Sequence, residues 1–223
     1  MQTTHAVYRR KPKQVYIAQE GYPFIAIALI GALVLWLVGV VLGAWIMLFI
    51  TGFIAFFFRN PNRTPPEGKD LILAPADGKI LSIEKNVKAP YTGNASTKVS
   101  IFMSVLNVHM NRFPITASVK DAFYNAGRFL VASLDKASEH NERHTLLLED
   151  GAGREYVLVQ IAGLIARRIV CYLKVGDTLL GGDRFGLIRF GSRVDIYLPP
   201  EAKVEVEVGK KTRGGVTVLG RFR

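Results

Sequence analysis

Cysteine is almost absent from this chain of 223 residues, which has only Cys171. One cysteine excludes an intramolecular disulfide and any metal site built from cysteines alone. Charge is missing from residues 21–58, which contain no Lys, Arg, Asp, Glu or His. A water-exposed segment of that length without charge is excluded, so this part of the chain is typical of a membrane segment.

The uncharged stretch is too long for one straight helix through a bilayer. Its 38 residues would extend roughly 57 Å at 1.5 Å per residue, whereas the hydrocarbon core is ~30 Å thick. Gly39 and Gly43 lie near its middle. We therefore expect a helical hairpin with arms at about 22–38 and 41–58. A cleaved signal peptide would have an apolar region of only about 7–15 residues, which disfavours that alternative.

Basic residues flank the uncharged stretch on both sides: Arg9, Arg10, Lys11 and Lys13 before it, Arg59 and Arg63 after it. The positive-inside rule then places both ends in the cytoplasm, which predicts a protein of the cytoplasmic membrane with its soluble domain on the cytoplasmic side. The net charge of +11 favours an anionic partner. Anionic lipid is the simpler choice beside a membrane segment, because no nucleic-acid-binding motif is present.

Four regions follow from composition. Residues 1–20 form a basic tail, 21–58 the membrane hairpin, and 59–69 a linker rich in proline and turn residues. Residues 70–223 have the composition of a soluble domain and are numerous enough to build a core, so disorder is excluded as their main state.

The soluble region predicts a mainly β fold. Short β-branched runs alternate with Gly, Pro and Asp turns, and no helical periodicity exceeds three turns. The expected strands are 78–84, 98–103, 115–123, 144–148, 156–161, 167–172, 194–198, 204–208 and 216–219. Alternation is clearest in residues 203–208. This pattern indicates a compact β-sandwich or barrel-like catalytic domain.

Four short segments carry residues capable of chemistry, and each has a simpler interpretation. Asp77 precedes Gly78 in a typical turn sequence, and His109 lies among apolar neighbours, where a structural histidine is common. His140 and His144 are four residues apart, but the segment lacks the pattern of a helical zinc site, so we expect no metal. Gly191 precedes Ser192, a pair equally typical of a plain turn.

Taken together, five ordered segments resemble the short form of the phosphatidylserine decarboxylase family. They are Ala-Asp-Gly-Lys at 76–79, Asn-Val-His-Met-Asn-Arg-Phe-Pro at 107–114, Asn-Glu-Arg at 141–143, Ile-Ala-Arg-Arg-Ile-Val at 165–170 and Arg-Phe-Gly-Ser-Arg-Val-Asp at 189–195. The resemblance runs from about residue 59 to 199. It implies a pyruvoyl-dependent lyase that converts phosphatidylserine to phosphatidylethanolamine and CO2 and needs no external cofactor.

The resemblance also implies a zymogen that cuts itself. Ser192 would attack the Gly191 carbonyl, and elimination would leave a large chain 1–191 and a small chain 192–223, held together non-covalently. Residue 192 would become a pyruvoyl group, whose Schiff base with the substrate amine would delocalise the electrons left by decarboxylation.

By the same resemblance, Asp77, His109 and Ser192 would act as a triad. Asn111 and Arg112 are candidate substrate-binding residues, with Arg112 as a cation facing the phosphate or carboxylate. Longer family members carry a second histidine three residues after the first, where this chain has Arg112. We therefore expect His109 to serve both self-cleavage and proton donation.

Two alternatives remain open from the sequence. One is an archaeal-type decarboxylase acting on a serine lipid with ether-linked chains. The other is a non-enzymatic, membrane-anchored domain that binds anionic lipid through its basic surface. The oligomeric state is open as well, and a homo-oligomer is compatible with the sequence.

Overall fold

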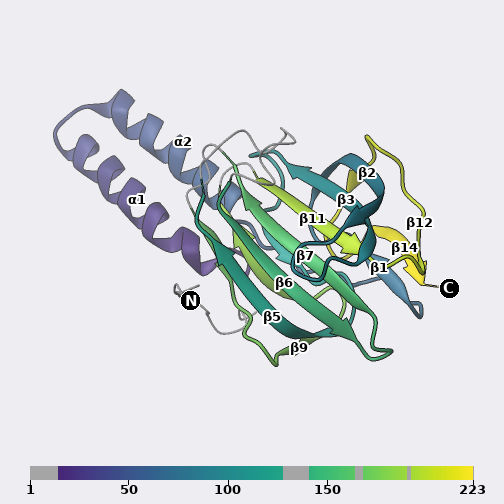
Figure 1. Cartoon of the computed structure of the whole chain (residues 1–223). Coiled ribbons are helices and arrows are strands. Elements are labelled where there is room, and N and C mark those ends of the chain that lie inside the picture. Colours follow the sequence, from purple (N-terminus) through teal and green to yellow (C-terminus); the bar gives the residue numbers. More distant parts are fainter. Residues whose placement is uncertain (1–14, 128–140, 164–167, 190–191, 223) are drawn as a thin grey trace. The chain divides into compact units, whose positions relative to one another are not determined.

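The computed structural model describes residues 15–127, 141–163, 168–189 and 192–222 (Figure 1). These described residues fall into two compact units, one within 12–62 and the other within 63–223. Each unit is described by itself.

The first unit is a pair of apolar helices. A 3-10 turn, η1 (Gln19–Gly21), leads into α1 (Tyr22–Leu37), and α2 (Val41–Phe57) follows. The turn between them uses Gly39 at φ +80°, a conformation that favours glycine. The segment Gln19–Leu37 is long and apolar enough to cross a membrane, whereas Val41–Phe57 is shorter. Most large side chains of both helices are exposed, which indicates an association with lipid.

The second unit, which we call the β unit, consists of antiparallel strands, which confirms the mainly β prediction. They are β1 (Leu71–Leu73), β2 (Gly78–Lys88), β3 (Ala95–Met103), β4 (Met110–Arg112), β5 (Ala117–Asn125), β6 (Arg143–Asp150), β7 (Glu155–Ala162), β8 (Ile169–Cys171), β9 (Thr178–Leu179), β10 (Arg184–Ile188), β11 (Ser192–Leu198), β12 (Ala202–Val204), β13 (Lys211–Thr212) and β14 (Val218–Phe222).

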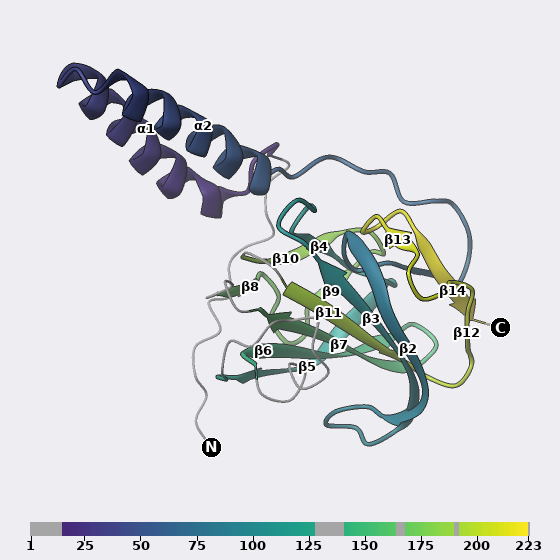
Figure 2. The same cartoon turned by 90° about the horizontal axis from the view of Figure 1, so that it is seen from above.

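Three sheets form from these strands. The largest has the order β13-β2-β3-β11-β7-β6-β5-β9, and its long strands lie side by side in Figure 1. Two smaller sheets have the orders β4-β10-β8 and β1-β14-β12. Figure 2 shows β4, β8 and β10 lying together. Several sheets around one core agree with the sandwich-like architecture expected from the sequence.

The two faces of the large sheet differ. We call the face that carries Ile101, Leu158 and Ile196 the inner face, because these side chains are buried in the main hydrophobic core with residues of both small sheets. Alternation along each strand sends the intervening residues to the outer face, where Val157 and Val159 form a separate, smaller cluster. Inner or outer position therefore follows from the strand register.

One expected strand is wrong in its extent. Residues 203–208 alternate most clearly, yet β12 ends at Val204. The ladder with β14 runs from Ala202 to Val204, and the Glu205 N–H donates to the Leu219 carbonyl at 2.8 Å. The chain then turns towards β13, which pairs with β2. Val206 is nevertheless buried in the core, whereas Val208 is exposed, so the alternation does not correspond to one continuous strand.

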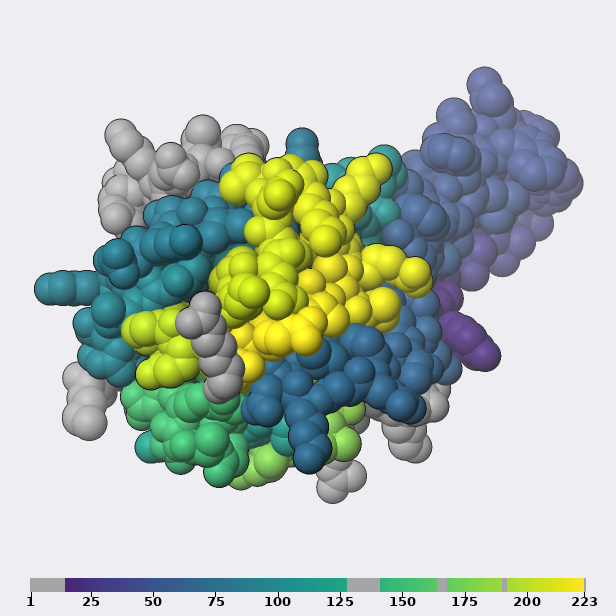
Figure 3. Space-filling view, turned by 90° about the vertical axis from the view of Figure 1, so that its right-hand side faces the viewer, coloured from purple at the N-terminus to yellow at the C-terminus, as the bar shows by residue number. Residues whose placement is uncertain are grey.

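β11 begins at Ser192 and pairs with β3 on one side and β7 on the other, so the last 31 described residues start in the middle of the large sheet. β14 pairs with β1, and β13 pairs with β2. In the space-filling view of Figure 3 the C-terminal residues, in yellow, lie against blue and teal residues from the beginning of the β unit. This part of the chain is held by many contacts that do not depend on the bond before residue 192.

Gly78 provides a test of the close contact at the start of β2. A Cβ atom at this position would lie 2.0 Å from the carbonyl oxygen of Phe102 on β3. Gly78→Ala is therefore expected to lower the free energy of unfolding by about 1–3 kcal/mol, because β2 and β3 must move apart. Urea unfolding of the detergent-solubilised protein measures this loss. Gly151→Ala is the control, since a Cβ there meets nothing within 4 Å; equal midpoints for the two variants would contradict the prediction.

Candidate active site

Ser192 occupies the first position of β11, with Met103 of β3 and Ala162 of β7 directly opposite. Directly opposed residues share a face, so its side chain lies on the inner face. The side chain is fully buried, and its Oγ has no hydrogen-bond partner among the described residues. Gly191, the other candidate cleavage residue, lies outside the described residues.

Asn111 of β4 contacts the sheet next to Ser192. Its Nδ2 lies 3.6 Å from the sulfur of Met103, and its Oδ1 accepts a hydrogen bond of 2.8 Å from Nε2 of Gln160 on β7. Met103 is the direct neighbour of Ser192, and Gln160 is opposite Val194. The structure thus brings Asn111 into contact with two residues that neighbour the candidate nucleophile in the sheet, Met103 and Gln160, and nothing in the sequence identified Gln160.

His109 immediately precedes β4 and is buried. Its Nδ1 lies 3.0 Å from the carbonyl oxygen of Asn107. Because a carbonyl can only accept, Nδ1 donates, and the neutral ring carries its lone pair on Nε2. The side chain of Asn107 is itself fixed by the backbone N–H and the hydroxyl of Ser104, both at 2.9 Å. This tight turn therefore helps to orient the imidazole.

Asp77 contacts a different partner from the one expected in a triad. Arg63 donates to both of its carboxylate oxygens, at 2.8 Å for Nη2 and Oδ2, and the Gly214 backbone N–H donates to Oδ1 at 2.7 Å. Arg63 Nη1 also donates to the Gly214 carbonyl at 2.8 Å. These contacts join the linker, the start of β2 and the C-terminal segment, and Arg63 is a partner that the sequence interpretation missed.

Arg112, at the end of β4, is buried and donates from Nη1 to the Gly182 carbonyl at 2.9 Å. Burial, together with the positive charges of Arg184 and Arg63, lowers its pKa to about 10, and Asp77 opposes part of this shift. The guanidinium remains charged at neutral pH. A concentration of cations close to the candidate site can bind an anionic group of a substrate.

Only one member of the histidine pair belongs to the described part of the chain. His140 lies outside the described residues, and His144 belongs to the strand β6 rather than to a helix. No group of three potential ligands from His, Cys, Asp and Glu occurs among the described residues. His144 is on the inner face opposite Gln160, and burial lowers its pKa to about 4. It is therefore uncharged at neutral pH.

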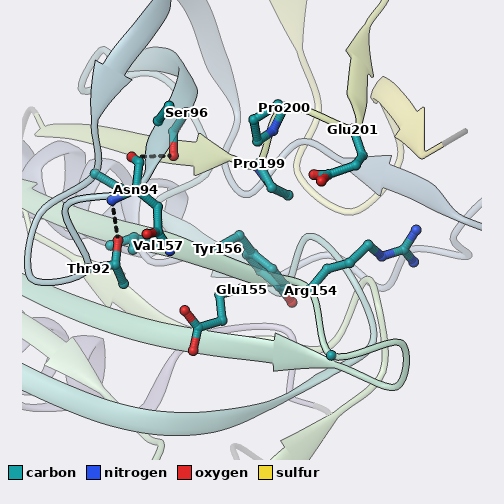
Figure 4. A pocket seen from close by; sticks show the side chains of 13 residues that line it. Thr92, Asn94, Ser96, Arg154, Glu155, Tyr156, Val157, Pro199, Pro200 and Glu201 are labelled. Carbon is teal, nitrogen blue, oxygen red and sulfur yellow. Dashed lines mark hydrogen bonds between the residues drawn. The ribbon is translucent and has the colours of Figure 1, made fainter.

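A well-formed pocket lies away from these residues (Figure 4). It has a volume of about 420 Å³ and is lined by residues that include Ser96, Tyr156, Pro199 and Glu201. Pro199 follows the last residue of β11, whereas Ser192 is the first. Seven residues of extended strand separate the two by roughly 23 Å. This pocket is thus distinct from the candidate active site.

Comparison with known proteins identifies the family. The family model described as phosphatidylserine decarboxylase matches residues 50–220. The chain belongs to the phosphatidylserine decarboxylase family. Proteins named phosphatidylserine decarboxylase proenzyme from Geobacter metallireducens and Syntrophotalea carbinolica are 50% and 52% identical to it, and each alignment covers 92% of this chain and 95% of the relative. A protein of that name from Geobacter sulfurreducens is 51% identical over the same shares.

Membership of the phosphatidylserine decarboxylase family confirms the resemblance found in the sequence. The match extends over all five motifs and over the whole β unit up to residue 220. Neither the ether-lipid alternative nor the non-enzymatic one is favoured by these relatives.

The ion pair of Asp77 and Arg63 predicts a stabilising role for both residues. Their side chains are 12% and 5% exposed, and removing one partner of a buried pair costs about 3–5 kcal/mol. Arg63→Gln and Asp77→Asn should each lower the free energy of unfolding by about that amount, and the double variant by less than the sum. Urea unfolding of the wild-type protein, the two single variants and the double variant measures these free energies.

Lys120→Gln, which breaks an exposed pair with Glu149, is the control and should leave stability unchanged. If Asp77→Asn prevented self-cleavage but left stability unchanged, Asp77 would instead act on His109 as the triad interpretation expects.

The lowered pKa of His144 predicts that the folded protein loses stability in acid. The unfolded chain binds a proton at this residue near its ordinary pKa of 6.5, whereas the folded chain binds it only near 4. Stability from the neutral ring is therefore complete above about pH 6.5 and is lost as the pH falls to about 4, a change of ~3 kcal/mol. Urea unfolding of His144→Asn across this range should show a flatter pH dependence than wild type. Parallel curves would contradict the assignment.

Proposed function

We propose that this chain is a self-processing phosphatidylserine decarboxylase in which Ser192 becomes the pyruvoyl group. The observation that supports this most strongly is the position of Ser192 at the first residue of a central strand, with a buried Oγ that has no partner among the described residues. A hydroxyl without a hydrogen-bond partner is costly to bury, and such atoms are common at reactive positions. The relatives are named as proenzymes of this activity.

Self-cleavage follows from the chemistry of a serine. Ser192 Oγ attacks the Gly191 carbonyl carbon, its proton passes to a base, and the C–N bond breaks to leave an ester and the free amine of residue 192. Loss of the α-proton of residue 192 then expels the Gly191 carboxylate. Water replaces the nitrogen, which leaves as ammonia, and residue 192 ends as a ketone. One water is consumed for each ammonia released.

His109 is the base in this proposal. Its Nδ1 donates to the Asn107 carbonyl, so the lone pair of the neutral ring is on Nε2, the atom that takes the proton in this proposal. Asp77 is a positioning residue, which holds Arg63 and the Gly214 amide beside β2 and thereby supports the turn that follows β13. Both roles can be tested separately, because the two side chains contact different parts of the β unit.

The pyruvoyl ketone supplies an electron sink for the electron pair that remains when CO2 leaves an amino acid. The residues of the chain would bind and orient the substrate around it. Asn111 offers an amide next to Ser192, and Arg112 offers a buried positive charge for the phosphate. His109 would return a proton to the product.

The helical hairpin agrees with a lipid substrate. Its apolar side chains are exposed in the described structure, and the basic residues on both flanks favour the cytoplasmic side of the membrane. An enzyme anchored in this way meets a phospholipid head group at the bilayer surface without extracting the acyl chains into water. We propose the cytoplasmic membrane as its location.

Intact mass spectrometry tests the proposal. Under denaturing conditions the wild-type protein should give two chains, 1–191 and 192–223, and an amine with a reductant should label only the small chain, because its first residue carries a ketone. Ser192→Ala should give one uncut chain, since the nucleophile is missing. Ser82→Ala in β2 is the matched control and should be cut like wild type. A wild-type chain that stays uncut and unlabelled would refute the proposal.

A further inference from the structure

Several buried polar atoms on the inner face of the large sheet have no hydrogen-bond partner among the described residues. They are Ser192 Oγ, Gln160 Oε1 and both ring nitrogens of His144. Burying a polar atom without a partner costs free energy, and native proteins rarely gather such atoms in one place unless a ligand or water completes them. The surrounding inner face is otherwise dominated by aliphatic side chains.

The strand register brings these three residues together. His144 on β6 is directly opposite Gln160 on β7, and Gln160 is opposite Val194 on β11. Ser192 lies two residues before Val194, so it is the diagonal neighbour of Gln160 on the same face, at a typical separation of about 7–8 Å. Gln160 therefore lies between the other two residues on the inner face, directly opposite His144 and diagonal to Ser192, and strand β7 separates His144 from Ser192.

The second sheet encloses this group. Nε2 of Gln160 donates a hydrogen bond to Oδ1 of Asn111 on β4. Oε1 of Gln160 is left without a partner among the described residues. Gly186 of β10 approaches from the same side, because a Cβ there would lie 3.2 Å from Gln160 Nε2 and 2.3 Å from the Val170 carbonyl oxygen. The amide is thus held in one orientation before any substrate arrives.

The unsatisfied atoms match the amino-acid part of a serine head group. Gln160 Oε1 accepts hydrogen bonds, and the neutral His144 ring offers one acceptor and one donor. An amine needs acceptors and a carboxylate needs donors. We infer that Gln160 and His144 bind the amino and carboxylate groups of the substrate at residue 192. This inference rests on the proposed function and adds two specificity-determining residues to it.

The absence of charge on this pair also suits the reaction. Burial keeps His144 neutral, and Gln160 carries no charge. A cation at this position would stabilise the carboxylate before CO2 leaves and would oppose the reaction, whereas a neutral donor can orient it without that penalty. Arg112, the buried cation, then serves the phosphate, which keeps its charge throughout.

Kinetic and binding measurements test this inference. His144→Phe removes both ring nitrogens while keeping an aromatic ring, and His144→Asn restores one donor and one acceptor. We expect His144→Phe to be cut normally but to lose at least tenfold in kcat/KM per pyruvoyl group, with partial recovery in His144→Asn. After borohydride reduction of the ketone, His144→Phe should bind glycerophosphoserine at least tenfold more weakly by calorimetry, while its affinity for glycerophosphate stays unchanged.

Thr145→Val is the matched control. Thr145 is the next residue of β6, is equally buried, and has an Oγ1 without a partner among the described residues, but it lies on the outer face. It should match wild type in every assay. If His144→Phe matched Thr145→Val in kcat/KM per pyruvoyl group and in glycerophosphoserine binding, the inference would be overturned while the proposed function stood. Should His144→Phe fail to fold, His144→Leu replaces it under the same criteria. An uncut wild-type chain would overturn both.

Discussion

Backbone hydrogen bonds on both edges of β11 are the constraint on which the rest of the structure depends. The strand pairs with β3 along one edge and with β7 along the other, beginning in both cases at Ser192. A strand held on two sides cannot shift its register without breaking both ladders. The reactive residue is therefore fixed relative to Met103 and Ala162, and it would keep this position after the preceding peptide bond is cut.

The alternation of side chains along β11 separates two kinds of polar chemistry. Ser192 points to the inner face, where its Oγ is left without a partner among the described residues. Arg193 points to the outer face, where its Nε donates to Asp195 at 2.6 Å and its Nη2 donates to Ser100 at 2.8 Å. The ion pair of Arg193 and Asp195 thus lies on the outer face of the strand, whereas the Ser192 Oγ, which has no partner among the described residues, lies on the inner face.

Much of the fold could be predicted from local sequence patterns, and the strands that were missed or misplaced have physical reasons. Long strands such as β3 and β7 have their own β-branched runs, so they were expected close to where they occur. The short strands β4 and β10 were missed, because a strand of three to five residues is defined by its partner rather than by its own alternation. The alternation in residues 203–208 was misleading, since only Val204 lies in a strand, whereas Val206 is buried outside it and Val208 is exposed.

The sequence by itself determined the family, the apolar hairpin and the identity of the candidate nucleophile, because motifs and charge-free runs are properties of consecutive residues. Only the tertiary structure decided which groups meet. It placed Arg63 against Asp77, the Asn107 carbonyl against His109, and Gln160 between His144 and Ser192 on the inner face. These partners are separated in the sequence by between two and about fifty residues, and no spacing rule predicts them. Strand register, which is set by hydrogen bonds between distant segments, brings the inner-face residues together.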